Sequence, residues 1–136
     1  MKTTRFIFNA ATTMLIAMLF VSAAPAAAPS PLTGHWTAID TIDGGTVHMT
    51  LSGGQNGVYQ LNAFDIHAPL ACGETGGLGL LQGTATYDAS TGIINKTVVA
   101  SCPSEGITYL ENTLEMQYDP VADAIYDPTF NLLYTR

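Results

Sequence analysis

Residues 46–52, TVHMTLS, alternate apolar and polar side chains without interruption. Because successive side chains of a strand point to opposite faces of a sheet, Val47, Met49 and Leu51 share one face. A strand with one apolar and one polar face is typical of an antiparallel sheet, whereas strands of a parallel sheet covered on both sides are apolar throughout. The stretch therefore predicts an antiparallel sheet with one buried face.

The same pattern recurs in short runs along the rest of the chain. These runs are rich in Thr, Val, Ile, Tyr and Leu and are separated by Gly, Asp, Asn and Pro, as at 43–45, 53–57 and 88–92. Short turns of this composition join neighbouring antiparallel strands into hairpins. We expect eight strands, which run from Gly34 to Thr41, Thr46 to Ser52, Val58 to Ile66, Leu80 to Tyr87, Ile93 to Ser101, Thr108 to Tyr118, Ala122 to Tyr126 and Asn131 to Thr135.

Eight hairpin-linked strands predict an all-β fold, an antiparallel up-and-down barrel, with a barrel-like β-sandwich as the alternative. The stretch from His67 to Gly79 contains a proline and four glycines and is expected to be a loop. A weak internal repeat aligns Tyr87–Ile94 with Tyr118–Ile125. It suggests one hairpin design used twice, although turn chemistry alone also favours Asp and Pro at such places.

The N-terminal residues have the layout of a cleavable export signal. Lys2 and Arg5 precede an apolar run from Met14 to Val21, and an alanine-rich stretch follows. The apolar run is about half of the roughly twenty residues that a membrane-spanning helix needs, which favours a cleaved peptide over a retained anchor. Small residues at the required positions predict cleavage after Ala23 or Ala26.

The chain is therefore expected to have three parts. These are a signal peptide over 1–26, a short linker over 27–33 and a single β-barrel domain over 34–136. About 110 residues suffice for one core but not for two. After cleavage the protein should be secreted, in the periplasm or outside the cell.

Cys72 and Cys102 are the only cysteines. An even number of cysteines in a small exported domain favours one intramolecular disulfide. A metal site with two thiolate ligands is the alternative, but the chain has no Cys-x-x-Cys spacing. We therefore predict a disulfide that ties the loop at Cys72 to the end of the fifth strand.

The expected mature chain is strongly acidic. It carries all eleven Asp and Glu residues of the protein, but only Lys96 and Arg136 among the basic ones. Nucleic acid is excluded as a partner on this ground, because phosphate binding needs a basic surface. An anionic membrane surface is disfavoured for the same reason, and the oligomeric state stays open.

The start and the end of the expected domain carry a family resemblance. Gly34-x-Trp36 contains the only tryptophan, and Arg136 lies where the eighth strand should stop. This combination resembles the calycin superfamily, the lipocalins and avidins. The resemblance implies that Trp36 packs across one end of an up-and-down barrel and that Arg136 covers it. The further tryptophans that line the biotin pocket of avidins have no counterpart here, so biotin is not the expected ligand.

The overall layout also resembles small exported bacterial β-proteins of unassigned function, a resemblance that brings no activity with it. The positions that carry it are Gly34, Trp36, Asp43-Gly44, Tyr59, Asp65, Cys72-Gly73, Cys102, Tyr118-Asp119-Pro120 and Arg136.

The polar residues offer little chemistry. His35, His48 and His67 lack the spacing of a zinc site, so no metal and no cofactor are predicted. Asp65 and His67 would share a face and could pair, with the carboxylate orienting the imidazole. No Gly-x-Ser-x-Gly elbow accompanies them, and we predict no catalytic residues. The carboxylates Glu111 and Glu115 are interpreted as solvated surface charges.

Two functional hypotheses of different classes follow. The first is a non-enzymatic barrel that binds a small apolar or amphipathic ligand inside. The second is an exported module with a filled core whose surface contacts another protein or a glycan, and a secreted hydrolase ranks third. The residues predicted to contact a ligand are the inward-facing Met49, Tyr59, Leu61, Leu110, Met116 and Tyr118.

Overall fold

The computed structural model describes residues 30–73 and 76–136. The predicted signal peptide over 1–26 and its cleavage sites lie outside the described residues. Within them, no helix is long and apolar enough to cross a membrane. The elements are β1 Gly34–Ile39, β2 Thr46–Gly53, β3 Val58–Asp65, α1 Pro69–Cys72, β4 Gly79–Asp88, β5 Ile93–Cys102, β6 Ile107–Thr108, β7 Asn112–Asp119, β8 Ala124–Asp127 and β9 Leu132–Tyr134.

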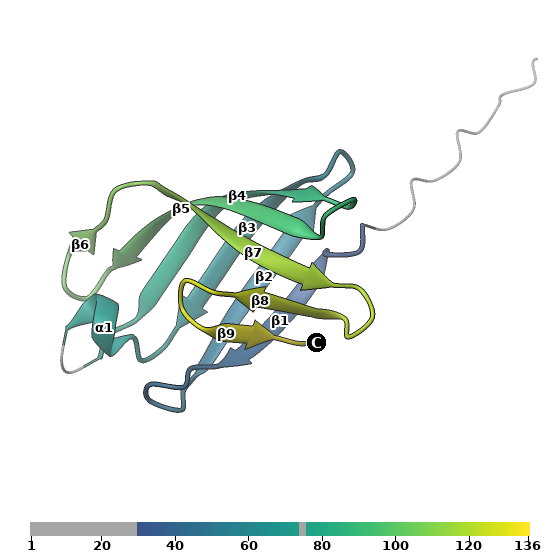
Figure 1. The fold of residues 1–136 in the computed structure, drawn as a ribbon. Coiled ribbons are helices and arrows are strands. Elements are labelled where there is room, and N and C mark those ends of the chain that lie inside the picture. The colour runs from purple at the N-terminus through teal and green to yellow at the C-terminus, as the bar shows by residue number, and fades with distance from the viewer. Residues whose placement is uncertain (1–29, 74–75) are drawn as a thin grey trace, which may run out of the picture.

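The strands form one antiparallel sheet that curls into a nearly closed barrel (Figure 1). Neighbours follow chain order from β1 through β5 to β7, β8 and β9, and only the two-residue β6 lies off this path, paired with β5. The last strand meets the first where Thr37 and Thr135 exchange two backbone hydrogen bonds of 2.8 Å each. The predicted eight-stranded antiparallel barrel is confirmed.

Two parts of the chain differ from the expectation. The predicted strand from Thr108 to Tyr118 is broken, because the chain leaves the sheet after β6 and re-enters it at β7. Leu110 lies in this gap and is 92% exposed, so its predicted place in the interior is wrong. The alternation read along β7 does not extend across the break. The expected loop at 67–79 contains the single helical turn α1, which begins with a proline at a position that lacks an internal N–H partner in any helix.

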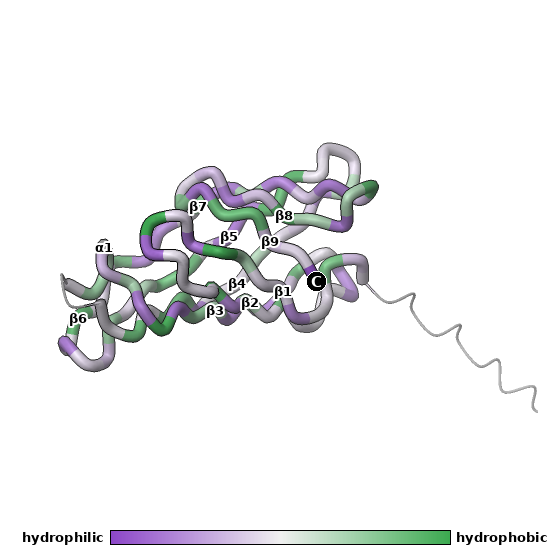
Figure 2. Tube along the Cα trace, turned by 90° about the horizontal axis from the view of Figure 1, so that it is seen from below, coloured by the Kyte–Doolittle hydropathy of each residue, from purple (hydrophilic) through white to green (hydrophobic). Residues whose placement is uncertain are grey.

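The barrel interior is packed by the apolar face of each strand. Along β2 the side chains of Val47, Met49 and Leu51 are 5%, 2% and 1% exposed, as the alternation predicts. The tube in Figure 2 shows apolar and polar residues alternating along the strands. Burial of one such side chain stabilises the fold by about 1.5–3 kcal/mol. The hydrophobic effect along these inward faces therefore accounts for the closed shape.

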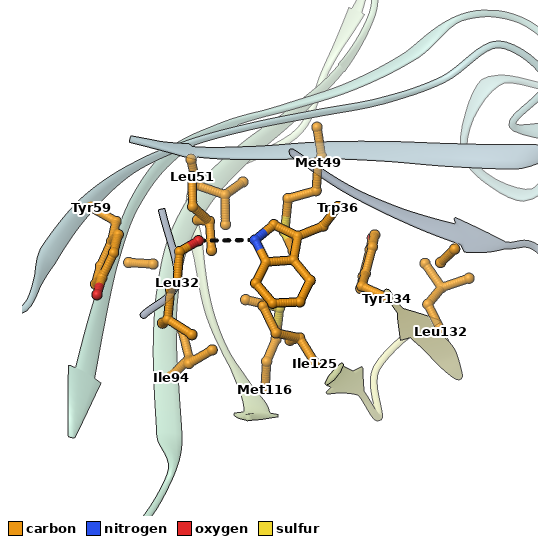
Figure 3. Packing of buried hydrophobic residues seen from close by; sticks show 14 of the residues in the cluster. Leu32, Trp36, Met49, Leu51, Tyr59, Ile94, Met116, Ile125, Leu132 and Tyr134 are labelled. Atoms are coloured by element: carbon orange, nitrogen blue, oxygen red, sulfur yellow. Dashed lines mark hydrogen bonds between the residues drawn. The ribbon is translucent and has the colours of Figure 1, made fainter. Parts of the chain in front are cut away.

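Trp36 fills one end of the barrel. Its side chain is fully buried, and its Nε1 donates a 2.9 Å hydrogen bond to the carbonyl oxygen of Leu32, which is also fully buried (Figure 3). The guanidinium of Arg136 lies 4.1 Å from the indole ring. It also donates to the carbonyl oxygen of Thr33. Residues 30–33, which we expected in a linker, thus belong to the closed end of the barrel.

Replacing Arg136 by lysine should lower the free energy of unfolding by about 1–2 kcal/mol. Lysine keeps the charge near Asp123, but it cannot stack on the ring of Trp36 and donate to the carbonyl oxygens of Pro31 and Thr33 at the same time. Urea unfolding followed by the fluorescence of this tryptophan measures the effect. A loss below about 0.5 kcal/mol would show that the guanidinium contributes no more than an ordinary surface charge.

The internal repeat corresponds to one turn used twice. The carboxylates of Asp88 and Asp119 each accept the backbone N–H two residues on, at 2.9 and 2.8 Å. Each turn then reaches a residue with positive φ, Gly92 at 76° and Asp123 at 48°. Glycine adopts this conformation without strain, and aspartate tolerates it better than most residues. The aligned positions therefore share a local structure and not only a composition.

Candidate functional site

A cavity of about 300 Å³ occupies the half of the barrel that lies away from Trp36. Its inner wall is apolar and comes from the inward faces of β2, β3 and β4. We call the side lined by Pro69, Ala71, Cys102 and Tyr109 its mouth; these residues lie in or next to α1, β5 and β6. In Figure 1, α1 and β6 are at the end of the barrel far from the C-terminus. The residues that line the cavity include Asp40, Ile42, Val47, Met49, Leu61, Ala63, Phe64, Asp65, Pro69, Leu81, Lys96, Cys102, Tyr109, Asp127, Phe130, Leu132 and Tyr134.

The predicted ligand contacts divide between the two ends of the barrel. Met49 and Leu61 line the cavity. Tyr59, Met116 and Tyr118 are buried but are not among its lining residues. The ring of Tyr118 packs edge-on against that of Trp36, with 6.2 Å between the ring centroids. Alternation along a strand predicts which face a side chain is on but not how far along the barrel it lies, so it could not separate these two groups. Leu110, the sixth predicted contact, is exposed, as described above.

Lys96 and Asp127 form an ion pair inside the barrel, which sequence reasoning missed. Their side chains are 3% and 1% exposed, and Lys96 Nζ donates to Asp127 Oδ2. The ammonium also lies 5.0 Å from the centroid of the Phe130 ring. Burial lowers the pKa of Lys96, and the neighbouring carboxylate opposes that shift. A signal was present, because Lys96 falls in phase with the buried Ile94 on β5.

Asp127 is held by the turn that follows it. Its Oδ1 accepts the backbone N–H of Thr129 at 3.1 Å, and Asn131 adopts a positive φ of 52°. The turns after Asp88 and Asp119 have the same two features, so residues 127–131 form a third turn of this design. Here, however, the second carboxylate oxygen faces inward to Lys96. One side chain therefore shapes the turn and neutralises the buried ammonium.

Tyr134 places a hydroxyl group in the cavity. The residue is 4% exposed, lines the cavity, and its Oη has no hydrogen bond to any residue in 30–73 or 76–136. In that part of the chain every fully enclosed polar side-chain atom has a hydrogen-bond partner. The hydroxyl is therefore not fully enclosed, and because Tyr134 lines the cavity, we infer that a molecule in the cavity can contact it. Burial raises its pKa, and so do the carboxylates of Asp127, Asp65 and Asp40, in that order.

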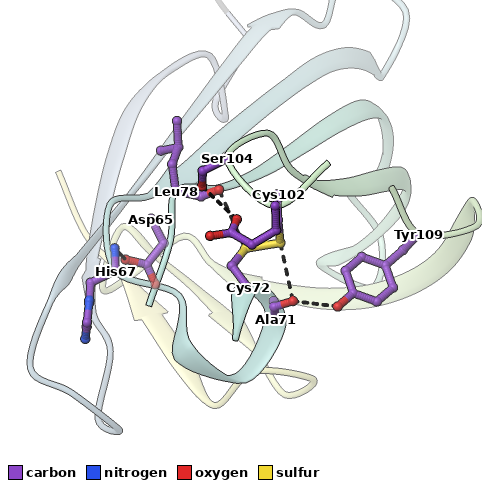
Figure 4. The surroundings of a disulfide bond; sticks show 9 residues. Asp65, His67, Ala71, Cys72, Leu78, Cys102, Ser104 and Tyr109 are labelled. Atoms are coloured by element: carbon purple, nitrogen blue, oxygen red, sulfur yellow. Dashed lines mark hydrogen bonds between the residues drawn. A yellow bond between two sulfur atoms is a disulfide. The ribbon is translucent and has the colours of Figure 1, made fainter. Parts of the chain in front are cut away.

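A disulfide anchors the mouth. Cys72 at the end of α1 is bonded to Cys102 at the end of β5, with the two Cα atoms 5.4 Å apart (Figure 4). This confirms the predicted pairing. Tyr109 adds a second tie, because its hydroxyl donates to the carbonyl oxygen of Ala71 at 2.5 Å. The described residues contain one group with metal-ligand spacing, the two cysteines with Glu105, and its sulfurs are already bonded to each other.

The predicted pairing of Asp65 with the imidazole of His67 is not formed. Asp65 Oδ1 instead accepts the backbone N–H of His67 at 3.0 Å. The imidazole Nε2 lies 3.8 Å from Asp43 Oδ2, because the chain turns after β3 and directs the ring towards the loop between β1 and β2. Glu111 and Glu115 are both exposed, as their interpretation as surface charges requires.

Comparisons with known proteins add no relative. No family model, no curated protein and no solved structure matches this chain. The nearly closed barrel, with Trp36 and Arg136 together at one end, is compatible with a calycin-like fold. The buried disulfide is compatible with a periplasmic or extracellular location. The function must be argued from the cavity itself.

Proposed function

We propose that the protein binds a small, mostly apolar ligand inside the barrel. The observation that carries this proposal is the cavity of about 300 Å³, with apolar walls and a few converging polar groups. Ligand sites in proteins combine these features, and this volume lies at the lower end of their usual range of roughly 300–1,000 Å³. A volume at this end of the range favours a compact ligand.

The proposal includes the place where binding occurs. Cleavage of the signal predicted over 1–26 would release the barrel into the periplasm or the medium, where the disulfide at the mouth persists. The barrel would act there as a carrier or scavenger without chemistry of its own. In this proposal the ion pair of Lys96 and Asp127 supplies a polar point in the otherwise apolar wall of the cavity.

Exposed apolar side chains around the mouth favour a second candidate, contact with another exported protein. Ile42, Tyr109 and Phe130 line the cavity and are still 56%, 44% and 45% exposed. Large exposed apolar groups that lie together mark interaction sites more often than isolated ones do. A partner docked over the mouth would bury them. The two candidates differ in whether the inner walls of the cavity matter for binding.

Filling the cavity tests the first candidate. Ala63→Leu adds bulk at a buried residue of the cavity wall, and Ala122→Leu makes the same change at an exposed turn. With the neutral fluorophore N-phenyl-1-naphthylamine, we expect Ala63→Leu to weaken binding at least about tenfold, since the added atoms occupy the space of the ligand. Ala122→Leu should bind like the unchanged protein.

The readout is the fluorescence increase on titration, with circular dichroism to show that both variants are folded. Absence of binding to the unchanged protein contradicts the proposal. Equal binding by all three proteins contradicts it as well, because the probe would then lie on the outer rim, in agreement with the second candidate.

A further inference from the structure

The charge inside the cavity is unbalanced. Three carboxylates line it, those of Asp40, Asp65 and Asp127, but Lys96 is the one basic side chain among the lining residues. Lys96 is fully engaged with Asp127. Asp40 and Asp65 form no ion pair with any residue in the described parts of the chain. Two negative charges therefore remain at the cavity without a counterion from the protein.

These two carboxylates each keep one oxygen free. Asp40 Oδ1 accepts the backbone N–H of Ile42 at 2.7 Å, and Asp65 Oδ1 accepts that of His67 at 3.0 Å. Their Oδ2 atoms make no hydrogen bond to residues 30–73 or 76–136. The capping hydrogen bonds fix the direction of each carboxylate, because each holds its side chain against its own turn. What remains is a pair of oriented acceptors beside an apolar cavity.

The two carboxylates and the Tyr134 hydroxyl influence one another. The pKa of Asp65 is raised mainly by burial and further by the negative charges of Asp43 and Asp40, while the backbone N–H and the imidazole of His67 oppose the shift. The pKa of Tyr134 is raised by burial and by carboxylates that include Asp65 and Asp40. These groups are thus near enough to feel each other's charge, and a positive charge among them would relieve the repulsion.

We propose that the ligand is an organic cation, an amphipathic amine whose ammonium group lies at Asp40 and Asp65 and whose apolar body fills the cavity. Tyr134 is 4% exposed as a residue, and its hydroxyl, otherwise without a partner in the described residues, accepts a hydrogen bond from the amine. This inference rests on the proposed function and adds the class of the ligand.

The aromatic and electrostatic surroundings support this class. Phe64, Tyr109 and Phe130 line the same cavity, and ring faces attract cations, as Phe130 already does with the Lys96 ammonium. An anionic ligand such as a fatty acid would bring a further negative charge beside two uncompensated carboxylates, and this repulsion would weaken its binding. A neutral alcohol would leave that repulsion unrelieved. Of these three classes of ligand, only a cation removes the repulsion between the carboxylates.

Three probes that share one apolar body distinguish these cases. 4-Phenylbutylamine, 4-phenylbutan-1-ol and 4-phenylbutanoate differ mainly in the charge of the end group, and calorimetric titration at pH 7 in low salt gives their affinities. We expect the amine to bind at least about tenfold more tightly than the alcohol and the carboxylate to bind more weakly than both. Raising the salt from about 0.02 to 0.5 M should reduce the preference for the amine, since salt screens exposed charges.

Two carboxylate variants connect the preference to the site. Asp65→Asn removes one charge and keeps an oxygen to accept the backbone N–H, and we expect it to abolish most of the preference for the amine. Asp119→Asn is the matched control, because Asp119 caps its turn in the same way but is absent from the cavity wall. Tyr134→Phe should weaken the amine and the alcohol about fivefold each, because both hydrogen-bond to the hydroxyl.

The outcomes separate the two proposals. If the alcohol or the carboxylate binds as tightly as the amine, or if Asp65→Asn leaves the order unchanged, the cation inference is wrong while the cavity remains a ligand site. If none of the three probes binds, and the neutral fluorophore also fails, the proposed function is wrong. Binding of the amine that Asp65→Asn and Asp119→Asn weaken equally would show a general charge effect and would also overturn the inference.

Discussion

Asp127→Asn should lower the free energy of unfolding by about 3–5 kcal/mol, the largest loss that we expect from any single substitution in the barrel. The side chains of Lys96 and Asp127 are 3% and 1% exposed, so the variant leaves an ammonium group in the interior without its counterion. Asparagine still accepts the N–H of Thr129, so the turn itself is kept. The loss therefore reports the uncompensated charge. Urea unfolding followed by far-ultraviolet circular dichroism measures it.

Asp88→Asn is the control for this change. Asp88 caps a turn of the same design, but it is exposed and contacts no lysine. We expect its loss to stay below about 0.5 kcal/mol, as for surface substitutions in general. If Asp127→Asn costs no more than Asp88→Asn, the ion pair does not stabilise the fold.

The pH dependence gives this prediction a second readout. Burial lowers the pKa of Lys96 below its ordinary value of 10.5, and the attraction of Asp127 opposes this shift, so the asparagine variant should lower the pKa further. The unfolded chain then binds a proton that the folded chain has released, and stability rises with pH by up to about 1.4 kcal/mol per pH unit. Between pH 7 and 9 the deficit of the variant should shrink. A deficit that does not change over this range would show that Lys96 stays charged without its partner.

A compensating substitution separates charge from packing. In the double variant Lys96→Met and Asp127→Asn, the buried ammonium is gone and methionine fills most of its volume. Replacing both partners of a buried ion pair by groups of similar shape is often neutral or stabilising. We therefore expect the double variant to recover most of the loss of Asp127→Asn and to lose its pH dependence. Failure to recover would assign the loss to the turn or to Phe130.

The fold could be predicted because its determinants are local. Alternation along residues 46–52 fixed the buried face of β2, and turn residues such as those at 88–92 fixed the pairing of consecutive strands. Leu110 shows the limit of this reasoning. Asn112 interrupts the apolar face between Leu110 and Leu114, so the periodicity of β7 does not reach Leu110.

The site could not be predicted in the same way, because its determinants are distant in the chain. Lys96 interrupts an apolar face of β5, and that interruption is visible in the sequence. Its partner Asp127 lies 31 residues further on, in a turn whose aspartate has a sufficient local reason to be there. Only the order β5, β7, β8 around the barrel brings the two together. The open hydroxyl of Tyr134 likewise depends on which end of the barrel is filled by Trp36.

Removal of the disulfide by Cys72→Ala and Cys102→Ala should lower the free energy of unfolding by about 3–4 kcal/mol. The two cysteines are 30 residues apart, so their bond closes a long loop in the unfolded chain and limits its conformational freedom. Chemical reduction of the unchanged protein should give a similar loss. A loss below about 1 kcal/mol in both experiments would contradict the prediction. Tyr109→Phe, which removes only the hydrogen bond to Ala71, should cost about 1 kcal/mol.

The double variant Cys72→Ala and Cys102→Ala also shows where the disulfide acts in the folded protein. Cys72 ends α1 and Cys102 ends β5 beside the mouth, whereas β2 is paired on both sides by β1 and β3. Amide hydrogen exchange should therefore accelerate in α1 and β6, which depend on this crosslink and on Tyr109. In β2 it should change only as much as the global stability does. Equal acceleration throughout would mean that the crosslink acts on the unfolded chain alone, and in that case the mouth keeps its shape and its ligand affinity without it.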